Sequence, residues 1–150
     1  MLAFAQTPGS VAKGKAVSDQ ARGPFEVKLK PMPVEGEPEG GLLARMSIDK
    51  QFHGDLEAVS KGEMLSAGTA VKGSAGYVAM ERVSGKLHGR NGTFVLQHTG
   101  TLTRGAPQLS VTVVPDSGTG ELVGLAGKMN IDIADGKHSY EFNYTLPESQ

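Results

Sequence analysis

The chain has 150 residues, with 15 Lys and Arg against 16 Asp and Glu for a net charge of −1, and it fits one domain with its own core. Its basic residues are scattered, aromatic residues make up only 5% and Trp is absent, which argues against a nucleic-acid partner. Because the chain has no Cys, disulfides, thiolate metal sites and Cys nucleophiles are excluded, and no stretch approaches the roughly 20 apolar residues of a membrane-spanning helix.

The N-terminal segment, residues 1–22, is rich in small, polar and charged types without periodicity, so we expect a flexible tail there and a folded domain over 23–150. Leu2-Ala3-Phe4-Ala5 resembles the last part of a signal peptide, although no basic region precedes it. The alternative is an unstructured start, and the compartment stays open between the cytoplasm and export.

From Phe25 onward, apolar and polar residues alternate, which is typical of half-buried β-strands. The alternation predicts strands over 25–30, 43–52 and 56–65, the last interrupted at Lys61-Gly62.

Two dipeptides, Asn91-Gly92 and Asp135-Gly136, each stand between alternating runs in the second half of the chain. Asn-Gly and Asp-Gly supply the positive φ of a type I′ turn, so each predicts a hairpin of fixed register. The predicted pairs are Arg90 with Thr93, Gly85 with His98 and Glu81 with Leu102 in the first hairpin, and Ala134 with Lys137, Ile131 with Tyr140 and Met129 with Phe142 in the second.

A third turn, at Gly105-Ala106-Pro107, leads into a strand around Val111, with Thr103 opposite Gln108. We count about eight short strands in meander order and no convincing helix. One apolar face on each strand favours an all-β fold, a closed antiparallel eight-stranded barrel, because closure leaves no exposed edge. A two-sheet sandwich is the alternative.

Three motifs in this region resemble a bacterial family of unknown function, DUF3224. They are GSAGYVAMERVSG from Gly73, GTFVLQHTG from Gly92 and VVPDSGTGELVGL from Val113, and KQFHGDLE from Lys50 is also similar. The resemblance runs from about Phe25 to Leu146. The family's fold is similar to the allene oxide cyclase barrel, whose relatives include plant dirigent proteins that hold hydrophobic molecules and steer a cyclisation or coupling. The resemblance implies a barrel, but no activity and no catalytic residues.

Glu81 and His98 fall on the predicted inner face, and Tyr77 extends the same row. A carboxylate and an imidazole inside an apolar barrel form a candidate acid–base site, with Tyr77 as an orienting donor. The predicted register separates Glu81 from the residue opposite His98 by four positions, roughly 13 Å along a strand, so a direct pair would need a bulge or a bridging ligand. The alternative is a solvated Glu81 at the barrel rim and a core histidine at 98.

The remaining inner positions are mostly large and apolar, and they are the predicted ligand-binding residues: Phe94, Leu96, Val113, Met129, Tyr140, Phe142 and Tyr144. An eight-stranded barrel holds either side chains alone or one small ligand. Gly85, Gly100, Gly124 and Gly127 either leave room for a ligand or relieve crowding in a filled core.

Lys50 and Glu57 stand on either side of the His53-Gly54 turn, where the sequence favours a surface ion pair over two inward-facing groups. The four histidines lack metal-ligand spacing, so we expect no metal site.

Three functions remain open. The first is a barrel that binds a small hydrophobic or amphipathic molecule and acts as an isomerase or cyclase without a cofactor, through Glu81 or His98 with Tyr77. The second is a non-catalytic carrier using the same cavity. The third is a structural or partner-binding module with a filled core, and a homo-oligomer is compatible with each.

Overall fold

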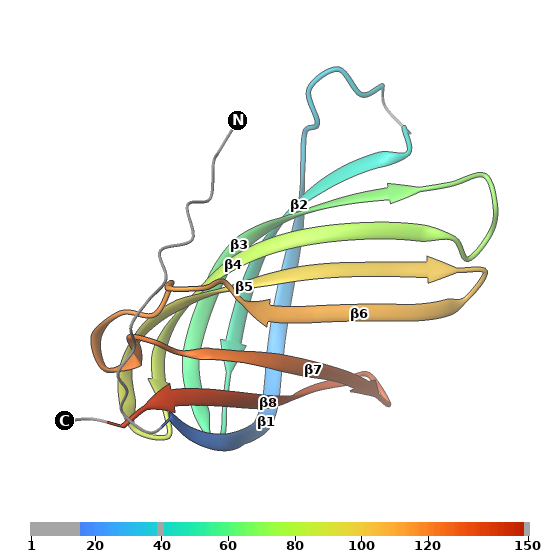
Figure 1. Ribbon diagram of the computed structural model, residues 1–150. Coiled ribbons are helices and arrows are strands. Elements are labelled where there is room, and N and C mark those ends of the chain that lie inside the picture. The colour runs from blue at the N-terminus through green and yellow to red at the C-terminus, as the bar shows by residue number, and fades with distance from the viewer. Residues whose placement is uncertain (1–15, 39–40, 149–150) are drawn as a thin grey trace, which may run out of the picture.

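The computed structural model describes residues 16–38 and 41–148, which form one closed barrel of eight antiparallel strands in sequence order (Figure 1). The strands are β1 (Ala16–Met32), β2 (Leu43–Phe52), β3 (Leu56–Gly68), β4 (Ala75–Leu87), β5 (Arg90–Thr103), β6 (Ala106–Val113), β7 (Ala126–Ala134) and β8 (Lys137–Pro147), with a short 3-10 helix, η1 (Gly120–Leu122), before β7. Pairing of β1 with β8 closes the barrel. The predicted all-β, closed eight-stranded barrel is confirmed.

Strand β1 begins at Ala16, inside the segment predicted to be a flexible tail. Residues 16–22 pair with β8, where Ala21 lies opposite Phe142 and is fully buried. The tail prediction is therefore wrong for 16–22, because a small side chain such as Ala21 carries little of the hydrophobic signal that marks a strand. The expected signal-peptide remnant at Leu2–Ala5 lies outside the described residues.

The Asp135-Gly136 hairpin has the predicted register. Ala134 lies opposite Lys137 and Met129 opposite Phe142. Asp135 and Gly136 have φ values of 52° and 75°, as a type I′ turn requires.

The hairpin between β4 and β5 turns earlier than predicted, at His88-Gly89 instead of Asn91-Gly92. Leu87 pairs with Arg90, and His88 and Gly89 have φ values of 46° and 80°. Gly92 lies within β5 and not in the turn. A side chain is excluded at this position because the loop before η1 packs against the strand, and a Cβ would come within 2.1 Å of the Thr119 carbonyl oxygen.

The new register moves the partner of Glu81 from Leu102 to Leu96, a shift of six positions. Because side chains alternate with a period of two, an even shift leaves every inner residue inside. The β5–β6 turn is likewise displaced: Thr103 pairs with Ala106 instead of Gln108, again by an even number of positions. Both predicted registers were wrong, whereas the predicted inner faces were right.

One end of the barrel, which we call the closed end, is packed with side chains. Phe94 stacks on Phe142 with ring centroids 5.8 Å apart, and Phe52 meets Tyr140 edge-on. Leu122 of η1 is 1% exposed and joins this core. Such packing leaves little free space at this end.

We call the opposite end of the barrel the open end. There β6 and β7 diverge from one another (Figure 1). Thr112 with Lys128 is the one residue pair between these strands in the described chain, whereas β4 and β5 pair along their full lengths. The barrel is therefore closed in topology but loosely joined along one seam, which opens beside the interior.

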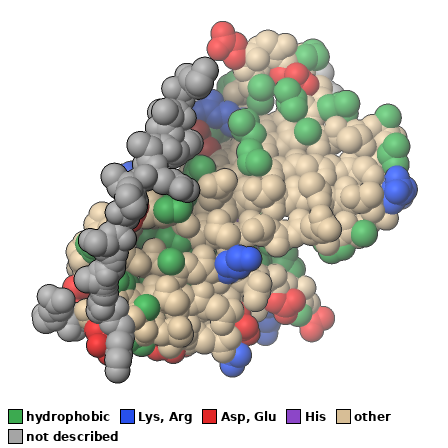
Figure 2. Space-filling view, in the orientation of Figure 1, with side chains coloured by type: hydrophobic (Ala, Val, Ile, Leu, Met, Phe, Trp, Pro, Cys, Tyr) green, Lys and Arg blue, Asp and Glu red, His purple; other side chains and the backbone are tan. Residues whose placement is uncertain are grey.

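The outer surface carries no single dominant charge on the face shown in Figure 2, where acidic and basic side chains are scattered. Among the described residues, no helix is long and apolar enough to cross a membrane.

Candidate functional site

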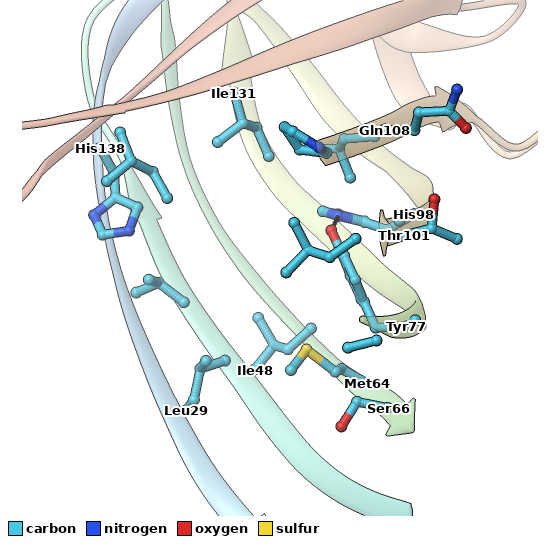
Figure 3. A pocket seen from close by; sticks show the side chains of 18 of the residues that line it. Leu29, Ile48, Met64, Ser66, Tyr77, His98, Thr101, Gln108, Ile131 and His138 are labelled. Atoms are coloured by element: carbon cyan, nitrogen blue, oxygen red, sulfur yellow. Dashed lines mark hydrogen bonds between the residues drawn. The ribbon is translucent and has the colours of Figure 1, made fainter. Parts of the chain in front are cut away.

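The open end contains a cavity of about 500 Å³, which extends into the barrel beside the β6–β7 seam. Apolar side chains from both sides of the barrel form most of its wall (Figure 3). The wall includes Phe25, Val27, Leu29, Ile48, Met64, Leu102, Leu109, Ile131 and Ile133, with Lys50, Ser66, Tyr77, His98, Thr101, Gln108 and His138 as its polar members. The interior is thus filled at one end and hollow at the other.

The predicted ligand-binding residues do not line this cavity. Phe94, Leu96, Val113, Met129, Tyr140, Phe142 and Tyr144 all lie in the packed core towards the closed end. Sequence alternation identified them as inward-facing, but it contains no information on how far along the barrel axis the packing extends. The structure therefore removes these residues from the candidate binding site.

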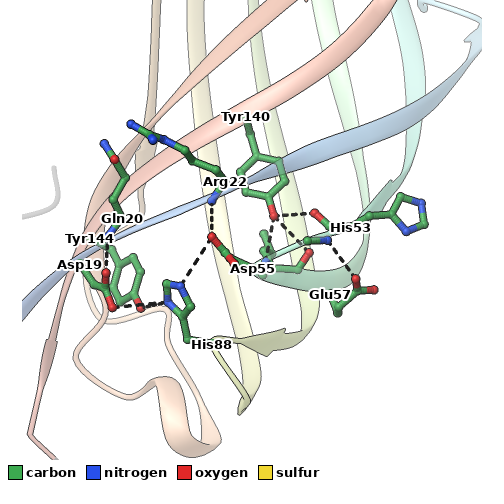
Figure 4. Close-up of polar contacts among 11 residues, drawn as sticks. Asp19, Gln20, Arg22, His53, Asp55, Glu57, His88, Tyr140 and Tyr144 are labelled. Carbon is green, nitrogen blue, oxygen red and sulfur yellow. Dashed lines mark hydrogen bonds and ion pairs between the residues drawn. The ribbon is translucent and has the colours of Figure 1, made fainter.

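Two of these residues tie the closed end together (Figure 4). The Tyr140 hydroxyl donates to the His53 carbonyl at 2.7 Å and accepts from the Leu56 N–H at 2.8 Å, and the Tyr144 hydroxyl lies 2.5 Å from His88 Nδ1. Burial is the main cause that raises the pKa of Tyr140 to about 12, so this phenol stays protonated and acts as a structural donor.

Of the glycines with two possible roles, Gly100 lines the cavity, and its missing side chain makes room for another residue. A Cβ at Gly100 would come within 2.3 Å of the Tyr77 ring. At Gly85 and Gly127 a Cβ would meet the neighbouring strand's backbone, and at Gly124 it would meet Pro147. Gly85, Gly124 and Gly127 thus relieve crowding. Gly100 is the one of these four glycines that lines the cavity, where it makes room for the Tyr77 ring.

A buried polar cluster lies beside the cavity and consists of Lys50 from β2, Ser60 from β3, Glu81 from β4 and His98 from β5. Glu81 is fully buried, and its Oε1 accepts from Lys50 Nζ at 3.0 Å and lies 2.8 Å from His98 Nε2. Its Oε2 accepts from the Ser60 hydroxyl at 2.8 Å. Both carboxylate oxygens are thus satisfied by partners from three other strands.

The cluster holds Glu81 in its ionised form. Burial by itself raises the pKa of Glu81, but the hydrogen bond with His98 and the charge of Lys50 outweigh it and lower the pKa to about 2. Because an ionised carboxylate can only accept, the proton in the Glu81–His98 contact belongs to His98 Nε2.

Tyr77 extends this arrangement towards the cavity (Figure 3). Its hydroxyl lies 3.1 Å from His98 Nδ1, which in a neutral imidazole with its proton on Nε2 accepts from the phenol. Burial, and then the charge of Glu81, raise the pKa of Tyr77, so it remains a phenol at neutral pH. Tyr77, His98 and Glu81 therefore form a hydroxyl–imidazole–carboxylate chain that begins at the cavity wall.

The structure brings together the three residues chosen from the sequence as an acid–base site. The predicted offset between Glu81 and His98 is wrong, because Ala79 instead of Gly85 lies opposite His98. This register sets the two side chains in direct contact without a bulge or a bridging ligand.

Sequence reasoning missed the other two members of the cluster. Lys50 faces inward with Ile48 and Phe52, and its ammonium lies 5.0 Å from the centroid of the Phe25 ring. Glu57, considered as its partner, is exposed and accepts from the Gly54 N–H at the turn. The period-two spacing of Ile48, Lys50 and Phe52 was the available signal for Lys50, whereas Ser60 gave none.

Chemically, the site offers hydrogen-bond donors and two imidazoles, those of His98 and His138, to an apolar space. The described residues contain no cluster of three or more His, Asp, Glu or Cys suited to a metal ion.

The comparisons with known proteins agree with this fold. The family model described as "Protein of unknown function (DUF3224)" matches residues 21–144. A solved structure of a DUF3224 protein of unknown function from Shewanella oneidensis MR-1 is 53% identical, covers 88% of this chain and 100% of its own, and superposes with a TM-score of 0.82. A comparison with curated proteins found no significant match. The family match and the structural similarity together show that the chain belongs to the DUF3224 family.

Proposed function

We propose that this protein binds a small, largely apolar molecule in the open-end cavity. The observation that carries the proposal is a space of about 500 Å³ inside a barrel whose other end is densely packed. Small-molecule sites have volumes of roughly 300–1,000 Å³, with mostly apolar walls and a few placed polar groups. The cavity wall has this composition.

The mouth of the cavity supports the same proposal. Four of its apolar side chains, Leu29, Leu102, Leu109 and Ile133, are between 42% and 63% exposed. Covering such surface is favourable by about 25 cal/mol per Å². An apolar ligand that reaches from the interior to the mouth therefore gains binding free energy by burying these side chains.

Binding is tested with a neutral fluorescent reporter, N-phenyl-1-naphthylamine, whose emission rises in apolar surroundings. The protein has no Trp, so its own fluorescence interferes little. We expect saturable binding to the wild type and loss of binding in Ser66→Phe, which fills the cavity. Leu65→Phe is the matched control, because this neighbouring position is 52% exposed and does not line the cavity.

Far-UV circular dichroism shows whether both variants keep the barrel. Equal reporter binding by folded Ser66→Phe and wild type, or no saturable binding by the wild type, would contradict the proposed site.

The Tyr77–His98–Glu81 chain favours a second candidate function, proton transfer on the bound molecule. In this reaction His98 Nδ1 takes a proton from the carbon next to a ligand carbonyl while Tyr77 turns to donate to the carbonyl oxygen. The electron pair of the broken C–H bond moves to that oxygen as an enolate, and Glu81 stabilises the imidazolium. In a ligand whose C=C bond is conjugated with this enolate, return of the proton to the far carbon of that bond shifts the double bond and completes an isomerisation with no cofactor.

Deuterium exchange tests this step without knowledge of the natural substrate. We use 1-tetralone, an apolar bicyclic ketone, in D₂O and measure its mass. Exchange faster than in buffer is expected for the wild type and is lost in His98→Gln, whereas reporter binding persists. A wild-type rate equal to that of buffer alone would leave the barrel as a carrier and refute the isomerase.

A further inference from the structure

Lys50 is the charged side chain in the wall of the open-end cavity. The described residues that line the cavity include no Asp or Glu and no Arg. Glu81, which binds Lys50, is fully buried behind the wall and is not among the lining residues. A molecule in the cavity therefore meets the side chain of Lys50 but no carboxylate.

The ammonium also has hydrogen-bonding capacity to spare. It carries three N–H donors, and among the described residues Glu81 Oε1 is the acceptor that it binds. The side chain is 6% exposed, and the rings of Phe25 and Phe52 lie 5.0 and 5.6 Å from Nζ. The rings attract the cation, but they offer no oxygen lone pair to its remaining donors.

A buried donor without an acceptor is costly, and an acceptor that carries negative charge gives the strongest hydrogen bond. The phenol of Tyr77, which stays protonated and donates to His98 Nδ1, adds no negative charge to the same wall. The polar part of the wall near the cluster is thus suited to an oxygen acceptor and unsuited to an ammonium group.

We propose that the ligand of this cavity carries an oxyanion, such as a carboxylate, on an apolar body, and that Lys50 binds this head group. This assignment rests on the proposed ligand-binding function and names the chemical class of its ligand. The apolar body lies along Leu29, Ile48 and Ile131 towards the mouth, so the molecule enters with its head group first.

The test compares three compounds with the same apolar body: 2-naphthoate, 2-naphthalenemethanol and 2-naphthylmethylammonium. Each displaces the neutral reporter from the protein at pH 7. Since a hydrogen bond to a charged group contributes about 1.5–3 kcal/mol, we expect naphthoate to bind roughly 10- to 100-fold more tightly than the alcohol, and the ammonium compound to bind most weakly.

Variants identify the residue responsible. Lys50→Met should abolish the preference for naphthoate over the alcohol, and Lys50→Arg should keep most of it. Lys61→Met is the matched control, because Lys61 is exposed on β3 and does not line the cavity. Lys50→Met leaves the buried Glu81 carboxylate with one partner fewer. The double variant Lys50→Met/Glu81→Gln removes both charges and provides a second measurement of the preference for naphthoate over the alcohol.

The outcomes separate this inference from the proposed function. Equal affinity of naphthoate and the alcohol for the wild type would refute the oxyanion assignment while leaving the binding site in place. An undiminished preference for naphthoate in folded Lys50→Met would refute the role of Lys50. Failure of the reporter and all three compounds to bind would refute both proposals.

Discussion

The ionised state of Glu81 should make the stability of this barrel strongly dependent on pH in the acid range. The pKa of this fully buried carboxyl lies at about 2, against an ordinary value of 4.5. Because one pKa unit corresponds to about 1.4 kcal/mol, roughly 3 kcal/mol of the free energy of unfolding depends on its ionisation. The folded-state pKa is the lower one, so this contribution is complete above pH 4.5 and is lost as the pH falls towards 2.

The perturbation that isolates this contribution is Glu81→Gln. At pH 7 the variant should be less stable by about 3 kcal/mol or more, because it removes the counter-charge of a buried ammonium. Most of this difference in stability should disappear at pH 2.5, because the wild type has then lost most of the free energy of unfolding that ionised Glu81 contributes.

Urea unfolding, followed by far-UV circular dichroism at pH 7, 4 and 2.5, measures the free energies. Glu63→Gln is the matched control, since Glu63 lies on the neighbouring strand in an exposed ion pair with Arg45 and should change stability by less than about 1 kcal/mol. If Glu81→Gln retains the wild-type dependence on pH, then the buried carboxylate does not carry the acid sensitivity and the reasoning fails.

Three further outcomes follow from the packing and pairing. Leu96→Asp places an unpaired charge at a fully buried position and should abolish cooperative unfolding, whereas Gln97→Asp at the next, exposed position should leave the melting temperature nearly unchanged; a folded Leu96→Asp would show that the inner face is misassigned. Gly100→Ala brings a Cβ against the Tyr77 ring and should displace it, which ring chemical shifts in NMR spectra report; unchanged shifts would contradict the contact. Amides of β6 and β7 that point across the seam should exchange with solvent faster than those between β4 and β5, and equal protection in hydrogen-exchange measurements would indicate a continuous ladder.

The sequence by itself determined which side of β4, β5 and β8 faces inward. Alternation has a period of two, so the inner positions of Glu81, His98 and Leu96 were correct even though the β4–β5 hairpin turns at a different dipeptide. The Asp135-Gly136 turn also fixed its register locally, because the type I′ geometry and the strand pattern agree there.

The contacts between inner residues were decided only by the tertiary structure. Two dipeptides near the end of β4 suit a tight turn, His88-Gly89 and Asn91-Gly92, and the loop before η1 occupies the space beside Gly92. That choice moves Glu81 by an even number of positions relative to β5. The move is invisible to alternation, but it turns two distant groups into a hydrogen-bonded pair.

The division of the barrel into a packed and a hollow end was equally beyond the sequence. Phe142 and Ile131 both face inward and alternate in the same way, but one lies in the core and the other lines the cavity. Which of them meets empty space depends on how β6 and β7 diverge and on which side chains arrive from the other strands. Local pattern fixes the direction of a side chain, whereas packing across the barrel fixes what it meets.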